Sequence, residues 1–316
     1  MKFRTELNIP KEKNTINYNS KIVLFGSCFT ENIEKHLTYF KFKNTSNSHG
    51  ILFNPKSIEK AVHDCIFNKE YKQNDLNYFD DIWFSFNHHT KFSSTYLAKI
   101  LKQINEDITN THNAILTASH VLITLGTSWV YRNKESENLV ANCHKIPQGN
   151  FKKEILSIDE ITEILNQIIS LIQEVNKKTT IIFTVSPVRH LKDGFVENAQ
   201  SKASLHTAIH QVIDNENTFY FPSYEIMMDD LRDYRFYKND LLHPNKFAMA
   251  YIWEKFKNSW IDEKVYYLMK EIDSIQKSLH HKPFREKSEK HQQFLKKLDS
   301  KIQAISNKIP YIEFNI

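Results

Sequence analysis

The sequence predicts an α/β fold in which helices cover both faces of a parallel β-sheet. Short runs of β-branched and aromatic residues alternate with segments of helical apolar spacing across roughly residues 20–260. This alternation is typical of a parallel sheet that is covered on both faces. Successive runs end at glycine or at Ser-Pro, where the chain turns. In such sheets, ligands bind at the carboxyl ends of the strands.

The first elements are predicted to be a strand, a turn and a helix. KIVLFG at residues 21–26 is a buried strand that ends at a glycine. Residues 30–40 place apolar side chains on one helical face, and Thr30 is a suitable N-cap. A second strand at 42–46 and a second helix at 56–67 follow.

An insertion of about residues 68–118 separates these elements from the next strand. Residues 70–92 are rich in Asp, Asn and aromatic residues and are predicted to be irregular, whereas 95–117 have helical spacing. SHVLITLG at 119–126 is the clearest strand of the chain. Residues 129–148 lack a helical period and predict an excursion with short strands.

The second half continues the alternation of strands and helices. The segment 158–175 is strongly amphipathic and predicts a helix, and TIIFTV at 180–185 predicts a strand. The last expected elements of the sheet domain are a helix at 198–213, a strand at 218–221 and a helix at 244–260.

We therefore interpret residues 1–262 as one domain that includes the insertion, and residues 263–316 as a charged helical extension. Pro283 is predicted to interrupt this extension. Its helices are expected to pack on the core or on a second subunit, so a homodimer formed through these C-terminal helices is one expectation.

The composition of the 316 residues is that of an ordinary globular protein, with 41% hydrophobic and 25% charged residues. Forty-two basic residues against 37 acidic ones give a net charge of +5, too mild an excess to indicate a nucleic-acid partner. Three widely spaced cysteines exclude a disulfide framework. The first residues, MKFRTELNIP, lack the apolar region of a signal peptide, so none is expected, and no apolar run is long enough for a membrane span. A cytoplasmic location without a membrane partner is therefore expected.

The glycines are unusually few, only five where about 22 would be average. A chain so poor in glycine is expected to keep one mainly where its backbone requires it. Gly26, Gly50 and Gly126 each follow one of the first three predicted strands.

One candidate nucleophile follows the first strand, in Gly26-Ser27-Cys28-Phe29. A serine here lies at the carboxyl edge of the sheet, where the free N–H groups and the dipole of the next helix favour a developing oxyanion. The alternative is that Ser27 only caps this helix.

A candidate acid–base pair lies far downstream, in Asp240-Leu241-Leu242-His243. An Asp three residues before a His can accept a hydrogen bond from Nδ1 and so aim Nε2 at a nucleophile. Pro244 suits the first turn of the following helix. The alternative is a solvated aspartate and a capping histidine.

Together, these two motifs resemble those of the SGNH (GDSL-like) hydrolases, and more closely the GSCFA-domain family, with Thr30 in place of the final Ala of that motif. The resemblance covers about residues 1–260. It implies a flavodoxin-like three-layer α/β/α sandwich with five parallel strands in the order 2-1-3-4-5. It also implies a catalytic triad of Ser27, Asp240 and His243.

The resemblance further implies an oxyanion hole formed by Ser27, Gly50 and a residue after the third strand. That residue is Asn in SGNH enzymes, but here it is Ser128 in Gly126-Thr127-Ser128-Trp129. Thr127 is an alternative donor, as are Asn142 and His144 in Asn142-Cys143-His144-Lys145. The neighbouring candidates for substrate binding are Thr127, Trp129, Asn142, His144 and Lys145.

A third cleft-facing segment is Ser186-Pro187-Val188-Arg189-His190 at the end of the fourth strand. Arg189 is suited to bind a carboxylate or a phosphate, and His190 is a further candidate for substrate binding. Asn198 and Lys202 are expected on the same rim. The alternative for Arg189 is a surface ion pair.

No metal and no cofactor is expected, because the adjacent pairs His88-His89 and His280-His281 do not present two ligands to one ion. Cys28 is interpreted as a packing residue, with a thiol enzyme as a less favoured alternative.

These motifs predict a serine esterase or O-acyltransferase that forms an acyl-enzyme on Ser27. The expected substrate is a small acyl ester, with O-acetyl groups on a carbohydrate as one possibility. The alternative from a different class is a non-catalytic module that binds a ligand in the same cleft.

Overall fold

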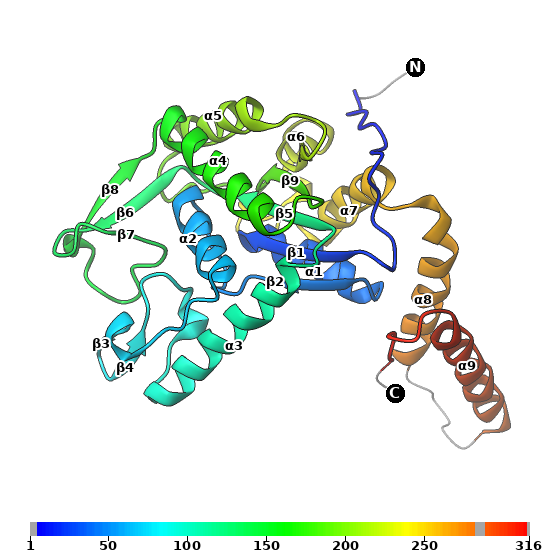
Figure 1. Ribbon diagram of the computed structural model, residues 1–316. Helices are drawn as coiled ribbons and strands as arrows, with labels where there is room; N and C mark the ends of the chain where they lie inside the picture. Colours follow the sequence, from blue (N-terminus) through cyan, green and yellow to red (C-terminus); the bar gives the residue numbers. More distant parts are fainter. Residues whose placement is uncertain (1–4, 282–287, 315–316) are drawn as a thin grey trace.

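A five-stranded parallel sheet forms the centre of the computed structural model, which describes residues 5–281 and 288–314 (Figure 1). The strand order is β2-β1-β5-β9-β10, and every neighbouring pair is parallel. The predicted fold class and strand order are therefore confirmed. The strands are β1 (Lys21–Gly26), β2 (Lys43–Ser46), β5 (His120–Leu125), β9 (Thr180–Val185) and β10 (Thr218–Tyr220).

Helices cover both faces of this sheet, and two apolar clusters fill the layers between them. One layer holds α2, α4 and α5, and the other holds α1, α7, α8 and α9. The bounds of the helices are α1 (Cys28–Tyr39), α2 (Pro55–Ile66), α3 (Leu97–Ile115), α4 (Ile158–Val175), α5 (Phe195–Val212), α6 (Ser223–Glu225), α7 (Lys246–Trp260), α8 (Tyr266–Leu279) and α9 (Glu289–Lys308).

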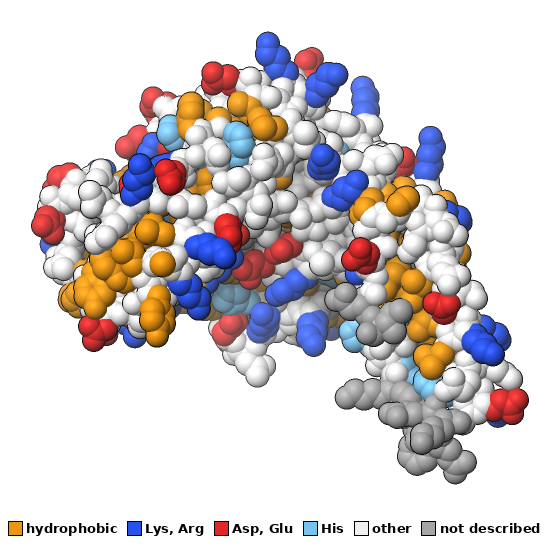
Figure 2. Space-filling view, turned by 60° about the horizontal axis from the view of Figure 1, so that its bottom comes forward, with side chains coloured by type: hydrophobic (Ala, Val, Ile, Leu, Met, Phe, Trp, Pro, Cys, Tyr) orange, Lys and Arg blue, Asp and Glu red, His pale blue; other side chains and the backbone are white. Residues whose placement is uncertain are grey.

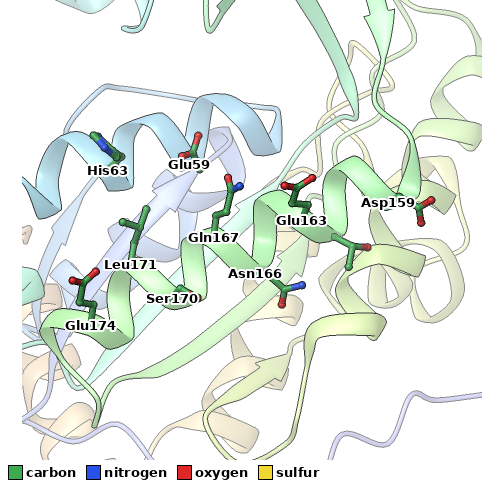
Figure 3. Close-up of a pocket in the computed structure, with 10 residues that line it drawn as sticks. Glu59, His63, Asp159, Glu163, Asn166, Gln167, Ser170, Leu171 and Glu174 are labelled. Carbon is green, nitrogen blue, oxygen red and sulfur yellow. The ribbon is translucent and has the colours of Figure 1, made fainter.

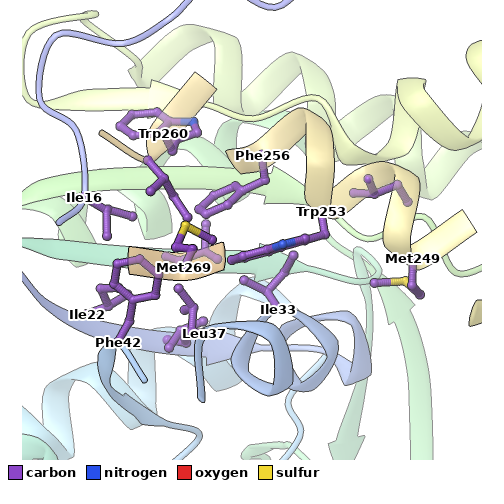
Figure 4. Packing of buried hydrophobic residues seen from close by; sticks show 14 of the residues in the cluster. Ile16, Ile22, Ile33, Leu37, Phe42, Met249, Trp253, Phe256, Trp260 and Met269 are labelled. Atoms are coloured by element: carbon purple, nitrogen blue, oxygen red, sulfur yellow. The ribbon is translucent and has the colours of Figure 1, made fainter. Parts of the chain in front are cut away.

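The second of these layers is rich in large aromatic side chains (Figure 4). Trp253 and Phe256 of α7 lie between the sheet and Ile33 of α1, and Met269 of α8 completes the cluster. The C-terminal helices α8 and α9 lie side by side at the end of the molecule away from β3 and β4, and their apolar faces join the same core. The predicted break at Pro283 lies outside the described residues.

Two excursions leave the sheet. The first, inside the insertion, contains the antiparallel hairpin β3 (Asn77–Phe79) and β4 (Ile82–Phe84), which the sequence predicted to be irregular. The second is a three-stranded antiparallel sheet in the order β7-β6-β8. Its strands are β6 (Trp129–Asn133), β7 (Leu139–Val140) and β8 (Phe151–Ile155). Figure 2 shows apolar side chains gathered over the end of the molecule that carries these two excursions.

Two predicted helix starts are wrong. Helix α1 begins at Cys28, with Ser27 and not Thr30 as its N-cap, because the Ser27 Oγ accepts a hydrogen bond from the Phe29 N–H. Pro244 lies before α7 and not in its first turn, because Asn245 is the N-cap and accepts from two N–H groups of that turn.

Across the described ranges 5–281 and 288–314, no helix is long and apolar enough to span a membrane.

Candidate functional site

Ser27 lies where β1 passes into α1, at the carboxyl edge of the sheet. Its own N–H donates to the Thr124 carbonyl of the neighbouring strand at 3.3 Å, and the side chain is buried. Gly26 has φ +133°, and a β-carbon there would lie 2.2 Å from the same Thr124 oxygen. The turn into α1 is thus possible only for glycine, and it fixes Ser27 at the positive end of the helix dipole.

Asp240 and His243 form a preorganised acid–base pair on the loop before α7. His243 Nδ1 is 2.8 Å from Asp240 Oδ2, and Asp240 Oδ1 accepts from the N–H groups of Leu242 and His243. These backbone hydrogen bonds, that of His243 first, lower the pKa of Asp240 to about 2. The carboxylate is therefore charged at neutral pH, and it leaves Nε2 as the reactive nitrogen of His243.

The loop with this pair reaches the edge of the sheet that carries Ser27. The Arg189 N–H, after β9, donates to the Leu242 carbonyl at 3.2 Å, which joins two of the predicted site segments. The positive charge of Lys238 lowers the pKa of the Cys28 thiol, and that of His243 lowers the pKa of His190, which indicates that each pair lies within electrostatic reach. Within residues 5–281 and 288–314, no hydrogen bond joins Ser27 to His243.

In the turn after β2, the backbone N–H of Gly50 is hydrogen-bonded within the turn itself. Gly50 has φ +78°, and its N–H donates to the Asn47 carbonyl at 2.7 Å. The Asn47 side chain in turn accepts from the Gly26 N–H at 2.9 Å. A β-carbon at Gly50 would lie 2.4 Å from the β-carbon of His89, which belongs to the insertion. Gly50 thus lets this turn pack closely against the insertion.

The segment after β5 is held by α5. The Ser128 N–H donates to Ser201 Oγ at 2.7 Å, and Thr127 Oγ1 lies 3.0 Å from the same oxygen. The buried Ser128 hydroxyl has no hydrogen-bond partner among the described residues. Trp129 Nε1 donates to the Glu197 carbonyl of α5 at 3.3 Å. The three residues therefore line the β5–α5 side of this edge.

The model of the GSCFA family matches residues 21–256, which is more than half of the chain. The chain belongs to the GSCFA family. A second model, the C-terminal domain of GSCFA domain proteins, matches residues 272–315. No curated protein matches the chain.

Lys202 of this GSCFA protein is buried, although the sequence placed it only on the rim. Its Nζ donates to the carbonyls of Gly126 at 2.7 Å and of Ser186 at 2.8 Å, and so bridges the ends of β5 and β9. Burial lowers its pKa to about 7. No local pattern reveals this, since α5 has only weak amphipathic character and its Lys resembles any surface Lys.

His190 lies beside Lys202 at the end of β9. Burial, and then the charge of Lys202, lower its pKa to about 3, so the imidazole is neutral. Its backbone N–H donates to Asn198 Oδ1 at 2.8 Å, and its buried Nε2 has no partner among the described residues. A β-carbon at Gly126 would lie 3.3 Å from this nitrogen, which places His190 against the end of β5.

Asn142, His144 and Lys145 are grouped with the insertion. The Asn142 N–H donates to the Phe86 carbonyl, and His144 Nε2 lies 2.9 Å from the Ser85 carbonyl oxygen. Lys145 lines a small hollow beside the β3–β4 hairpin. The contacts of these three residues therefore hold the insertion against the loop after β7.

A buried polar network lies beneath Gly50, and the sequence motifs did not indicate it. His49 Nε2 is 3.2 Å from Asp64 Oδ2, which also accepts from the Tyr71 hydroxyl at 2.8 Å. His88 stacks on His49, and Lys60 pairs with the other Asp64 oxygen. Burial keeps His49 neutral by lowering its pKa. Burial raises the pKa of Asp64, but the hydrogen bonds from His49 and Lys60 outweigh it, so this carboxylate is charged.

The Cys28 thiol is a weak candidate for nucleophilic chemistry. Burial raises its pKa, followed by the charge of Glu31, and the nearby lysines only partly offset this. Thiolate reactivity requires a lowered pKa. Cys65 and Cys143 are also free, and burial raises the pKa of each.

A hollow of about 760 Å³ lies away from these residues, on the outer faces of α2 and α4 (Figure 3). Acidic and amide side chains such as Glu59, Glu163 and Gln167 line it. A smaller cavity of about 330 Å³ lies beside Arg189 and the Asp240–His243 loop. Of the predicted site residues, Arg189 and Asn198 line this second cavity.

Proposed function

We propose that this GSCFA protein is an SGNH-type serine esterase or O-acyltransferase that forms an acyl-enzyme on Ser27. The observation that carries the proposal is the Asp240–His243 pair, which is hydrogen-bonded at 2.8 Å and attached to the same sheet edge as the N-cap serine of α1. This combination of an oriented imidazole and a serine at a helix N-terminus is the arrangement that acyl transfer uses.

In the first step, Ser27 Oγ attacks the ester carbonyl while His243 Nε2 takes the hydroxyl proton. The tetrahedral intermediate collapses, its C–O bond breaks, and His243 returns the proton to the leaving alcohol. Water or a sugar hydroxyl then attacks the acyl-enzyme with His243 again as base, and Ser27 is regenerated. Asp240 stabilises the imidazolium in both steps.

Two features favour negative charge at this edge of the sheet. The N-terminus of the 12-residue helix α1 points its dipole at Ser27. Lys202 Nζ bridges the ends of β5 and β9, and it is positively charged below about pH 7. The hydrogen bond from Phe29 N–H to Ser27 Oγ is long, at 3.3 Å. Rotation of the serine side chain toward a substrate therefore costs little.

The experiment is covalent labelling with a fluorophosphonate probe. Wild type is expected to be labelled and to hydrolyse short-chain aryl esters, whereas Ser27→Ala and His243→Ala are not. Ser204→Ala is the matched control, because this half-buried serine on α5 bonds only a carbonyl of its own helix. Labelling that persists in Ser27→Ala contradicts the proposal.

One observation favours the alternative of a ligand-binding module. The N–H groups of Ser27, Gly50 and Ser128 all donate to protein acceptors, and Ser27 is fully buried. Absence of both labelling and ester turnover in the folded wild type, with retained binding of a glycan ester, would establish this module.

A further inference from the structure

The cavity beside Arg189 has the composition of a ligand site. Its volume is about 330 Å³, and aromatic and methionine side chains form most of its wall. Met227 and Met228 come from a short π-helical turn, Ile226–Asp230, a geometry that often accompanies functional sites. The residues around it are Arg189, Leu191, Phe195, Asn198, Tyr224, Met227, Met228, Arg232, Asp233, Tyr234 and Tyr237.

This cavity borders the loop that carries Asp240 and His243. Arg189 donates to that loop twice, from its N–H to the Leu242 carbonyl at 3.2 Å and from Nη1 to the Leu241 carbonyl at 3.5 Å. Tyr237 lies on the same loop, whose ends are joined by the Lys238 N–H and the His243 carbonyl at 2.7 Å. Through Arg189 and Tyr237, a molecule in the cavity therefore lies against the base of the loop that carries His243.

The Arg189 guanidinium lies among three aromatic rings. Its Cζ is 5.6 Å from the ring centres of Phe195 and Tyr237, and 5.7 Å from that of Tyr234. Stacked rings hold a guanidinium in place and leave its edge able to bind two oxygens.

This guanidinium also lacks an acidic partner: no carboxylate lies within ion-pair distance of it in the described part of the chain. The other charged residues of the cavity are paired. Arg232 binds Asp229 at 2.7 Å, and Asp233 binds Arg235. Arg189 is therefore the group that remains to neutralise an anionic ligand.

We propose that this cavity binds the alcohol part of the ester substrate, and that Arg189 selects a sugar ring that carries a carboxylate or a phosphate. The rings and methionines contact the apolar face of the sugar, and the guanidinium binds the anion with two hydrogen bonds. The inference rests on the proposed esterase activity, because it assigns the cavity to the leaving or accepting alcohol of that reaction.

The test compares three acetyl esters that differ only in the charge of the alcohol. They are O-acetylated methyl glucoside, methyl glucuronoside and methyl glucoside 6-phosphate. The ratio of kcat/KM for each anionic ester to that for the neutral one is measured in wild type, Arg189→Gln and Lys192→Gln. Lys192 is an exposed cation on the same loop that does not line the cavity, so its variant controls for net charge.

Wild type is expected to prefer one anionic ester by on the order of 10- to 100-fold, the effect of one or two charge-assisted hydrogen bonds. The ester with the larger ratio distinguishes a carboxylate from a phosphate. Arg189→Gln is expected to lose this preference, and Lys192→Gln to retain it. An equal ratio in wild type and Arg189→Gln, or no preference in wild type, overturns the inference.

A binding measurement separates this inference from the proposed chemistry. Calorimetry on Ser27→Ala with the two anionic alcohols themselves requires no turnover. Binding that Arg189→Gln weakens by the same factor supports the cavity assignment even if no ester is hydrolysed. Turnover of the neutral ester without any anion preference refutes the cavity assignment and leaves the esterase proposal intact.

Discussion

Lys202 provides a quantitative prediction, because its buried charge makes the stability of the fold depend on pH. Burial lowers its pKa from 10.5 to about 7. Below pH 7 the Lys202 side chain carries its proton in both the folded and the unfolded protein. Burial of this charge then destabilises the folded state by about 5 kcal/mol. Between pH 7 and 10.5 the unfolded chain still binds a proton that the folded protein has released, so stability rises with pH.

The expected change is large enough to measure. From pH 7 to pH 8.5, this single group is expected to add about 2 kcal/mol to the free energy of unfolding. In Lys202→Met the rise disappears, since no proton is bound at that position in either state. Lys178→Met, at an exposed position, is the matched control and is expected to behave as wild type.

The assay is urea unfolding at several pH values between 7 and 8.5. The thiols of Cys65 and Cys143 titrate alike in both proteins. Burial already raises the pKa of Cys28, and loss of the Lys202 charge only raises it further. The difference between wild type and Lys202→Met therefore reports chiefly on Lys202. Equal slopes in the two proteins would refute the reasoning. If the variant does not fold, NMR titration of the Lys202 side chain in wild type decides the matter, because a midpoint above pH 9 is incompatible with the burial described.

Three further outcomes are expected. Asp240→Asn should lower kcat for aryl esters by on the order of 10²- to 10⁴-fold with little change in KM, as steady-state kinetics will show, because the amide no longer orients His243; an unchanged kcat would remove Asp240 from the mechanism. Gly26→Ala should destabilise the fold by at least about 2 kcal/mol in urea unfolding, since the new β-carbon meets the Thr124 carbonyl in a left-handed backbone. Asp64→Asn should cost about 3 kcal/mol at pH 7, because it leaves buried partners uncompensated. The Asp64 pKa is lowered in the folded state, so this difference should shrink as the pH falls below about 4, and a constant difference would show that the charge is irrelevant.

Much of the sheet was predictable because each strand is a local signal. β9 and α4 begin and end at the residues that the sequence predicted, Thr180–Val185 and Ile158–Val175. A continuous apolar run and a strong helical period need no knowledge of the neighbours. The strand order came from the family resemblance and not from periodicity.

The polar contacts were harder to predict because they join residues far apart in the chain. The hydrogen bond between Ser128 and Ser201 spans 73 residues, so no local pattern could show that the Ser128 N–H is occupied. The burial of Lys202 depends on two carbonyls from different strands. The pairing of Asp240 with His243 was predictable because three residues of one loop can close that contact.

The network beneath Gly50 draws its members from three separate segments: the turn with His49, helix α2 with Asp64, and the insertion with Tyr71 and His88. If the insertion detached alone, Asp64 would lose the Tyr71 hydroxyl, and the stacked imidazoles would separate. Partial opening at this place therefore breaks polar and ring contacts that all three segments share. In hydrogen exchange, the amides of the insertion helix α3 and those of α2 should become exchangeable together, as one cooperative unit.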